Sequence, residues 1–580
     1  MNDDISTTPT RPRIDLTVFG VTAALVIAFL AWGLAAPDNL SAVTTDILSW
    51  ITGSLGWLFI LSATGFVVFA VCLALSKYGK IPLGKDGERP EFRTISWIAM
   101  MFSAGMGIGL MFFGSYEPLY HFVEAPPGMT AGDVRTAMAT TMFHWGFHPW
   151  AMYAVVGLAL AYSTFRLGRN QLMSAVFAPI LGKQANGAGG KVIDILAIFA
   201  TLFGTVASLG LGALQIGSGL SNVGWVDNPG TTLLVAIIAV LTAAFVASAV
   251  SGVAKGIQRL SNINMVLAIV LAVFVFVVGP TVFILNLLPT TLGAYANDIT
   301  AFSARSSATV DAEGESWLAG WTIFYWAWWV SWTPFVGMFL AKISRGRTIR
   351  EFVIGVMVVP TTVSLVWFCV FGGTAIREQT DGVLGFDPAT AASEDTLFQM
   401  LDHLPLTGIA SALAMILVAI FFVSGADSAS LVMGTLSERG AHEPSRSVTV
   451  FWGVLTGAVA ALLLAMSGGD GLNGIKQMAI IAALPFVVVM IGMCLSLYLD
   501  LRRDPLIVAR SQLDDQVDRH IRKQAEKIGT GEILVVDPAA IDRKSRGRRR
   551  IRRRADASAD LPVSATGEPA VAVAETEPRP

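Results

Sequence analysis

The stretch from Trp317 to Trp332 holds six tryptophans in an apolar segment without charged residues. Helical periodicity brings four aromatic positions near one face: Trp321, Tyr325, Trp328 or Trp329, and Trp332. An aromatic belt at a membrane surface would explain Trp317 and Trp321, but not the tryptophans about half way along the run. Aromatic faces attract cations that lack hydrogen-bond donors, above all quaternary ammonium groups. The segment therefore predicts part of a binding site for such a group.

A second aromatic group lies in the string MFHWGFHPWAMY, at Trp145, Trp150 and Tyr153. His144 and His148 in the same string have the spacing of a metal-ligand pair. No third ligand is evident, and Pro149 disturbs the helix beside them. We therefore interpret the two histidines as structural.

Three glycines, Gly105, Gly107 and Gly109, interrupt the apolar run 94–116. Each weakens a helix by roughly 1 kcal/mol relative to alanine. In membrane transporters such interrupted helices expose backbone carbonyls that coordinate ions. Close helix packing through Gly105 and Gly109 is the alternative, because their spacing is that of a GxxxG pair. Both interpretations remain open at this point.

Hydroxyl side chains recur at helical spacing in two further runs. One run contains Thr201, Thr205 and Ser208, and the other contains Ser424 and Ser428 around Asp427. Hydroxyl oxygens suit sodium, although bonding to their own backbone is the common alternative. A carboxylate inside a membrane is costly and signals function. Asp427 is therefore a candidate, unless it lies near the cytoplasmic end and pairs with a gate residue such as Lys342.

The composition indicates a membrane protein that positions these residues on helices. Only 14% of residues are charged and 54% are hydrophobic, whereas a soluble domain has about a quarter charged. Twelve apolar runs reach the roughly 20 residues that a spanning helix needs: 16–36, 51–76, 94–116, 142–163, 195–220, 232–254, 261–288, 316–341, 352–376, 404–436, 447–467 and 475–499. The runs are too long and continuous for barrel strands. An all-α membrane protein of twelve transmembrane helices is predicted.

Loop charges predict the orientation. With a cytoplasmic N-terminus, the inside loops hold most of the Lys and Arg residues, and only four lie outside: Arg135, Arg305, Arg377 and Lys476. The protein is then expected in the cell membrane, with both termini in the cytoplasm. Residues 1–15 form a short tail. The C-terminal segment 500–554 ends in RKSRGRRRIRRR, which would attract anionic lipid headgroups or simply remain solvated. Residues 555–580 have a disordered composition.

Three strings carry a resemblance to a known family: GMGIGLMFFG, MFHW..HPWA.Y and WTIFYWAWWVSWTPFVGMFLA. Together they resemble the betaine–choline–carnitine transporter family, and in particular its sodium-coupled glycine betaine carriers. The resemblance implies a LeuT-like core of two inverted five-helix repeats, 94–288 and 316–499. Two extra helices, within 16–93, would precede them, and an amphipathic helix and outer loop would occupy 289–315. It also implies a homotrimer.

The resemblance also implies site residues. The box for trimethylammonium maps onto Trp145, Trp150, Tyr153 and Trp329, with Trp328, Trp332 and Phe324 lining the path. The substrate carboxylate would meet Ser208 and the backbone around Met106. One sodium site maps onto Ala104, Met106, Phe421, Ser424 and position 425, and the other onto Thr201, Thr205 and Phe335. The chain departs from the pattern at Gly425, where a hydroxyl is expected. Gly109 replaces the acid of choline-type carriers and favours a zwitterion.

Sodium-coupled uptake of a zwitterionic compatible solute is therefore the predicted function, with glycine betaine first and with osmotic regulation. Ectoine, proline or carnitine are alternative cargoes, and Gly425 leaves open an exchanger that needs no ion gradient. A channel or a membrane enzyme would be a different class. An enzyme is disfavoured because no nucleophile–base pair or metal cluster is evident beyond the two histidines, so no catalytic residue and no organic cofactor are predicted.

Overall fold

The computed structural model describes residues 14–105, 107–251, 254–466 and 471–528. Side chains are described in these ranges except at 102–105, 250–251, 254–261, 471–472 and 524–528. The predicted basic cluster at 543–554 and the sodium and substrate ligand Met106 lie outside the described residues, as does the side chain of Ala104. Throughout the described ranges the elements are helices, with a single isolated bridge between Pro82 and Thr348. The predicted all-α class is confirmed.

Every predicted run falls on one helix or on two or three consecutive helical elements, but fewer helices satisfy a test for spanning by length and hydropathy. In the described part of the chain eight do so, or nine if the bent pair Asn262–Val278 and Thr281–Ser303 is one span. The remaining runs are interrupted, or rich in tryptophan, which lowers their mean hydropathy. The count of twelve crossings therefore stays a prediction.

The first two helices of the described chain are α1 (Leu16–Ala35) and α2 (Pro37–Leu75). The Asp15 carboxylate caps α1 by accepting hydrogen bonds from the backbone N–H groups of Thr17 and Val18, at 3.1 and 3.2 Å. Pro37 opens α2 at a position where a helix needs no N–H donor. Asp15 also pairs with Lys191 of a later helix, at 3.0 Å, which ties the first helix to the core.

The first half of the core is formed by α3 (Thr94–Gly105), α4 (Ile108–Val123), α5 (Val134–Trp145), α6 (Phe147–Ala161), α9 (Ala188–Asn222), α10 (Thr231–Ser251) and α11 (Ala254–Val278). Short helices α7 (Met173–Val176) and α8 (Ala178–Leu181) connect α6 to α9. The predicted interruption separates α3 from α4. A second break, at Gly146, separates α5 from α6, where a side chain would collide with the backbone of Met142 and the ring of Tyr295.

The second half is formed by α12 (Thr281–Ser303), α13 (Ala312–Leu318), α14 (Phe324–Ile343), α15 (Ile349–Thr380), α16 (Thr396–Asp402), α17 (Thr407–Ser437), α18 (Arg446–Met466) and α19 (Gly471–Arg502), followed by α20 (Pro505–Ile528). A π-helix, Ala319–Ile323, joins α13 to α14. Trp321 still lies beside Tyr325, with ring centroids 6.2 Å apart.

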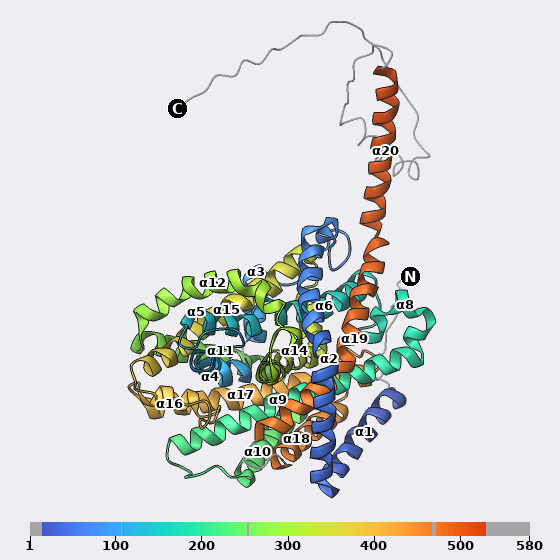
Figure 1. The fold of residues 1–580 in the computed structure, drawn as a ribbon. Helices are drawn as coiled ribbons and strands as arrows, with labels where there is room; N and C mark the ends of the chain where they lie inside the picture. The colour runs from blue at the N-terminus through green and yellow to red at the C-terminus, as the bar shows by residue number, and fades with distance from the viewer. Residues whose placement is uncertain (1–13, 106, 252–253, 467–470, 529–580) are drawn as a thin grey trace, which may run out of the picture. The chain divides into compact units, whose positions relative to one another are not determined.

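The chain divides into two compact units, 1–507 and 508–580. Within the first, α14 lies in the middle of the bundle and packs against α6, α9 and α19 (Figure 1). Helix α4 packs against α5 and α15, and α17 packs against α9. The Trp-rich helix is therefore surrounded by the helices that carry the other candidate residues.

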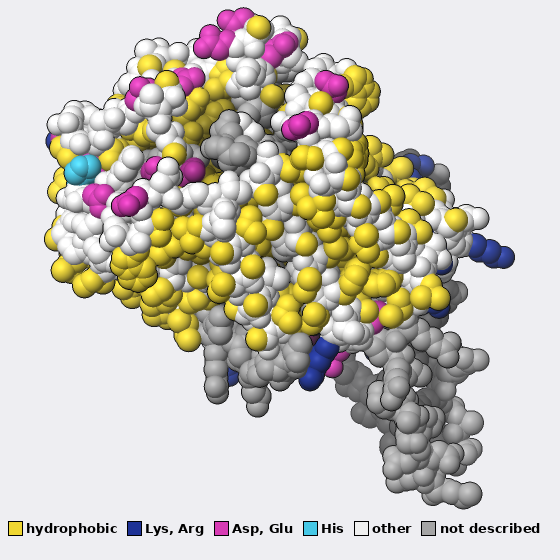
Figure 2. Space-filling view, turned by 90° about the horizontal axis from the view of Figure 1, so that it is seen from below, with side chains coloured by type: hydrophobic (Ala, Val, Ile, Leu, Met, Phe, Trp, Pro, Cys, Tyr) yellow, Lys and Arg dark blue, Asp and Glu magenta, His cyan; other side chains and the backbone are white. Residues whose placement is uncertain are grey.

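Figure 2 shows one face of the protein, largely covered by hydrophobic side chains. Acidic side chains gather along one edge of this face, and Lys and Arg appear mainly on other parts of its rim. Large aliphatic side chains such as Leu16, Ile95 and Val282 are exposed at helix surfaces, which suits contact with lipid rather than water. The chain is a multi-pass membrane protein.

Candidate substrate site

A cavity of about 50 Å³ lies beside α14. It is lined by Gly107, Ile108, Gly109, Leu110, Trp145, Pro149, Trp150, Tyr153, Ser208, Trp328, Trp329, Trp332 and Ser364. Seven of the nine substrate-site residues implied by the resemblance therefore border one space. Phe324 does not; it is buried and stacks on Trp328, with ring centroids 5.7 Å apart. Met106, the ninth, lies outside the described residues.

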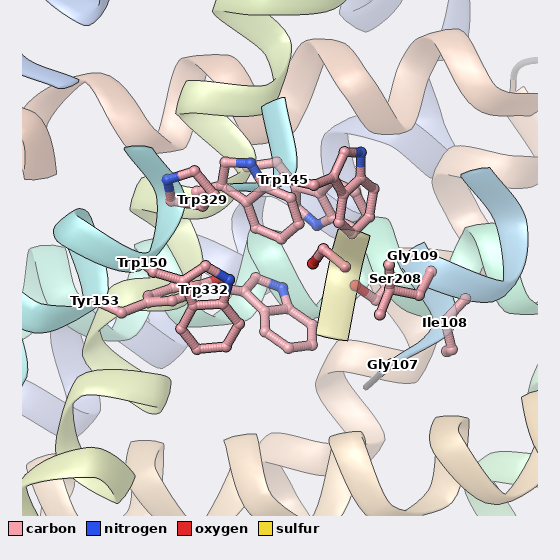
Figure 3. A pocket seen from close by; sticks show the side chains of 13 residues that line it. Gly107, Ile108, Gly109, Trp145, Trp150, Tyr153, Ser208, Trp329 and Trp332 are labelled. Carbon is pink, nitrogen blue, oxygen red and sulfur yellow. The ribbon is translucent and has the colours of Figure 1, made fainter. Parts of the chain in front are cut away.

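Aromatic rings form most of the wall. The rings of Trp145 and Trp329 meet edge to face, 4.8 Å apart and at 78°. Tyr153 is 6.2 Å from Trp329 and 5.3 Å from Trp150. Figure 3 shows these side chains on one side of the pocket and Ser208 with the segment Gly107–Gly109 on the other. This arrangement offers aromatic faces to one end of a small ligand.

Two of the lining residues carry unpaired donors. The Ser208 hydroxyl and the Trp328 indole N–H are buried, and neither has a hydrogen-bond partner in the described protein. Buried polar groups normally find partners, so both suit an acceptor supplied by a ligand. None of the described lining residues is charged. A ligand with one positive and one negative end would match this wall better than a net cation.

Gly109 brings the backbone of α4 against the aromatic wall. A Cβ atom at this position would lie 2.7 Å from the Trp328 ring and 2.8 Å from the Trp145 ring. Both distances are below ordinary van der Waals contact, and indole rings in a packed wall have little room to retreat. Glycine therefore sets the width of the cavity here.

Gly109→Ala should narrow the cavity and raise the apparent Km for the transported solute about tenfold, since overpacking costs about 1–3 kcal/mol. Concentration-dependent uptake measures this effect. Gly65→Ala is the matched control, because a Cβ at Gly65 on α2 meets nothing within 4 Å. An unchanged Km in Gly109→Ala would contradict the contact with the two rings.

A larger cavity of about 320 Å³ adjoins the first, and both are lined by Gly107, Ile108, Ser208 and Trp332. Five predicted sodium ligands line this second cavity: Thr205, Phe335, Phe421, Ser424 and Gly425. Thr201 does not, but its backbone oxygen accepts the Thr205 hydroxyl at 2.7 Å. Asp427 and Lys342 line the same cavity without forming an ion pair within 4.0 Å. The expected Asp427–Lys342 pair is therefore not formed in this conformation.

The other side of the site is closed by aromatic residues. Phe113 packs between Trp321 and Trp328, with centroid distances of 6.5 and 6.0 Å. Trp317 and Trp321 are 8% and 7% exposed, so the interpretation of these two as a lipid-facing belt is wrong. They line a separate outer bowl, which has no described lining residue in common with the substrate cavity. The described conformation is open only toward the larger cavity.

The two histidines have different partners on different helices. His144, on α5, meets the Glu117 carboxylate at 2.7 Å and the Thr322 hydroxyl at 3.1 Å. His148, on α6, stacks on Trp326 with centroids 5.2 Å apart. The break at Gly146 separates them, so they do not act as a pair. Glu117 lies one residue beyond the predicted run 94–116 and therefore was not a predicted site residue; α4 continues to Val123.

Comparison with known proteins agrees with this architecture. Residues 17–506 match the betaine/carnitine/choline family of transporters. The betaine/ectoine transporter LcoP of Corynebacterium glutamicum is 43% identical over 91% of this chain and 84% of its own length. The glycine betaine transporter OpuD of Bacillus subtilis is 46% identical over 86% of this chain and 97% of its own length.

Another relative is glycine betaine transporter 1 of Vibrio parahaemolyticus, 42% identical over 84% of this chain and 94% of its own. Among solved structures, a sodium-coupled sialic acid symporter covers 75% of this chain and 85% of its own at 12% identity, with a TM-score of 0.40. That similarity is too low to bear on the argument. The family match confirms the resemblance in the three sequence strings, and the relatives are transporters, not enzymes. The chain belongs to the betaine/carnitine/choline family of transporters.

Proposed function

We propose that this transporter carries a zwitterionic quaternary-ammonium solute, glycine betaine first, by symport with sodium. The observation that supports it most is the composition of the small cavity: its lining combines aromatic faces with two unpaired donors, the Ser208 hydroxyl and the Trp328 indole N–H. Trimethylammonium would sit against Trp329 and its neighbours. The carboxylate would accept from Ser208. The names of the relatives, betaine and betaine/ectoine transporters, agree with this cargo class.

Sodium coupling is supported by hydroxyl groups in and beside the larger cavity. The Thr201 and Thr205 hydroxyls donate to backbone oxygens four residues earlier, at 2.8 and 2.7 Å. Their lone pairs therefore remain free to accept a hard cation. Ser424 donates to the backbone oxygen of Phe421 at 3.3 Å, in the same way. Sodium and solute would favour the same conformation, and release toward the larger cavity would follow rocking of the two repeats.

Gly425→Ser should restore the hydroxyl that the family pattern has at this position. A Cβ at Gly425 meets nothing within 4 Å, so the serine side chain fits without displacing its neighbours. One added ligand is worth about 1 kcal/mol, so the sodium concentration for half-maximal uptake should fall about fivefold.

The matched control is Gly408→Ser, on the same helix and equally free of neighbours, but away from the described cavity lining. Uptake measured over a series of sodium concentrations compares the two variants. Equal sodium dependence in Gly425→Ser and wild type would contradict the assignment of a cation to this position.

The function is tested by uptake of radiolabelled betaine, ectoine, proline and carnitine into a carrier-deficient host, with sodium present or replaced by potassium. Saturable, uphill, sodium-dependent betaine uptake is expected. Uptake indifferent to sodium would contradict the symport mode and favour the exchanger. Flux that does not saturate would indicate a channel. Association into a homotrimer, osmotic activation and contact of the C-terminal segment with anionic headgroups belong to the same proposal.

A further inference from the structure

Glu117 is an acid in the interior of the membrane bundle, and the mechanism above does not use it. It lies in α4, its side chain is 0% exposed, and it has no Lys or Arg partner within 4.0 Å in the described part of the chain. Its only possible ion partners there are His121 and His144. A buried acid in a membrane protein is costly to keep, so its contacts deserve a functional explanation.

The carboxylate collects three short hydrogen bonds. Its Oε2 atom accepts from the Trp145 indole N–H at 2.6 Å and from the Tyr325 hydroxyl at 2.5 Å. Its Oε1 atom lies 2.7 Å from Nδ1 of His144. These partners come from α5 and α14, so one side chain of α4 links three helices.

Two adjoining tryptophans of the aromatic wall depend on these contacts. Trp145 is held directly by its indole nitrogen. Trp329 donates to the backbone oxygen of His144 at 3.0 Å. The ring of Tyr325 stacks on Trp329, 6.0 Å away and at 18°. The spacing of the two tryptophans is therefore set by groups that meet at Glu117.

We propose that Glu117 is a positioning residue that fixes the spacing and angle of Trp145 and Trp329, and thereby the fit of the quaternary ammonium group. The inference rests on the proposed function for the identity of the ligand. Glu117 does not line the described cavity, so it acts through the two rings and not by contact. The Oε2 atom of Glu117 must be a hydrogen-bond acceptor, because the indole N–H of Trp145 can only donate and the Tyr325 hydroxyl donates to the same oxygen.

The competing explanation is a cation site. Ligand atoms of Glu117, His121 and His144 lie within 4.8 Å of one another, and neither nitrogen of His121 has a hydrogen-bond partner in the described structure. However, both nitrogens of His144 already have partners, Glu117 and Thr322. The Glu117 oxygens also point at donors. An ion would have to displace these contacts, so positioning is the better-supported role.

Two substitutions separate these roles. Glu117→Gln keeps an acceptor oxygen for Trp145 and Tyr325, and its amide can face His144 Nδ1 in the other imidazole tautomer. Glu117→Met keeps the length of the side chain but removes both oxygens. We expect the Kd for betaine, measured by calorimetry on purified protein, to stay within about threefold of wild type in Glu117→Gln and to rise about tenfold or more in Glu117→Met.

Tyr325→Phe removes one donor and keeps the ring that stacks on Trp329, so it should raise the Kd by a smaller factor than Glu117→Met. It also keeps the test decisive if Glu117→Met does not fold. Glu124→Ala is the matched control: it removes an acid at the C-terminal end of the same helix, facing the outer bowl. Its Kd should equal that of wild type.

Near-UV circular dichroism without ligand reports the tryptophan geometry independently of any cargo. The spectrum of Glu117→Met should differ from wild type, and that of Glu117→Gln should match it. An unchanged spectrum and Kd in Glu117→Met would overturn the proposal. Equal losses of betaine affinity in Glu117→Met and Glu117→Gln would also overturn it. Such a result would mean that binding depends on the charge at this position, through a bound cation or proton. Failure of the wild type to bind betaine would instead count against the proposed function, with the spectra still deciding the role of Glu117.

Discussion

Trp329→Leu should raise the Kd for betaine about 30-fold, with little change in the amount of folded protein in the membrane. A desolvated cation–π contact is worth about 2 kcal/mol, and about 1.4 kcal/mol corresponds to tenfold in affinity. Trp329 contributes a face that also meets Trp145 and Tyr153, so its loss opens the box on two sides. Calorimetry, or the Km of uptake, measures the effect.

Trp329→Phe should recover part of the affinity, because a benzene ring retains a negative face of smaller area. Trp225→Leu is the control, because Trp225 is exposed and does not line the described cavity. A betaine affinity in Trp329→Leu equal to that of wild type would contradict the aromatic box. A loss shared equally by the Trp225 variant would point to general damage.

The sequence was sufficient for the class of fold and for the residues around the cavity, because both depend on local patterns. Long apolar runs identified the helices. The sequence strings around Trp145 and Trp329 identified the aromatic wall of the cavity. The structure places the ring centroids of these two tryptophans 4.8 Å apart. The glycine interruption was also visible, since glycine weakens a helix wherever it stands.

Features that depend on three-dimensional contacts were not visible in the sequence. Glu117 looked like the end of a span, and only its three partners from other helices identify its role. The π-helix at Ala319–Ile323 interrupts the Trp-rich segment, whereas the sequence was interpreted with an even 3.6-residue period. Neither feature can be recognised from the types of residues and their spacing in the sequence.

Arg166 and Asp504 form a buried ion pair outside the spanning segments. The Arg166 guanidinium donates to both Asp504 oxygens, at 2.9 and 3.1 Å, and Tyr162 donates to the same carboxylate at 2.8 Å. Their side chains are 6% and 0% exposed. Arg166 also reaches Asp86, which is 63% exposed, at 2.5 Å. One guanidinium therefore makes a buried and an exposed ion pair, and the two can be compared directly.

Asp504→Asn should lower the free energy of unfolding by about 3 kcal/mol at neutral pH, because it leaves Arg166 with an uncompensated charge at its buried side. Asp86→Asn, at the same guanidinium, should cost less than about 1 kcal/mol because Asp86 itself is 63% exposed. Thermal unfolding of the purified transporter in detergent measures both. Equal losses of unfolding free energy in Asp504→Asn and Asp86→Asn would contradict the claim that burial determines how much each ion pair contributes to stability.

The pH dependence supplies a second check on Asp504. Burial by itself would raise the pKa of Asp504, but hydrogen bonds from Arg166, from Tyr162 and from a backbone N–H hold it below the ordinary value of 3.8. The folded protein therefore binds this proton less readily than the unfolded chain, and the stabilisation is complete above pH 3.8. It is lost as the pH falls through the lowered pKa. The stability difference between wild type and Asp504→Asn should thus be constant near neutrality and shrink only in strong acid; a difference that shrinks already near pH 6 would contradict the lowered pKa.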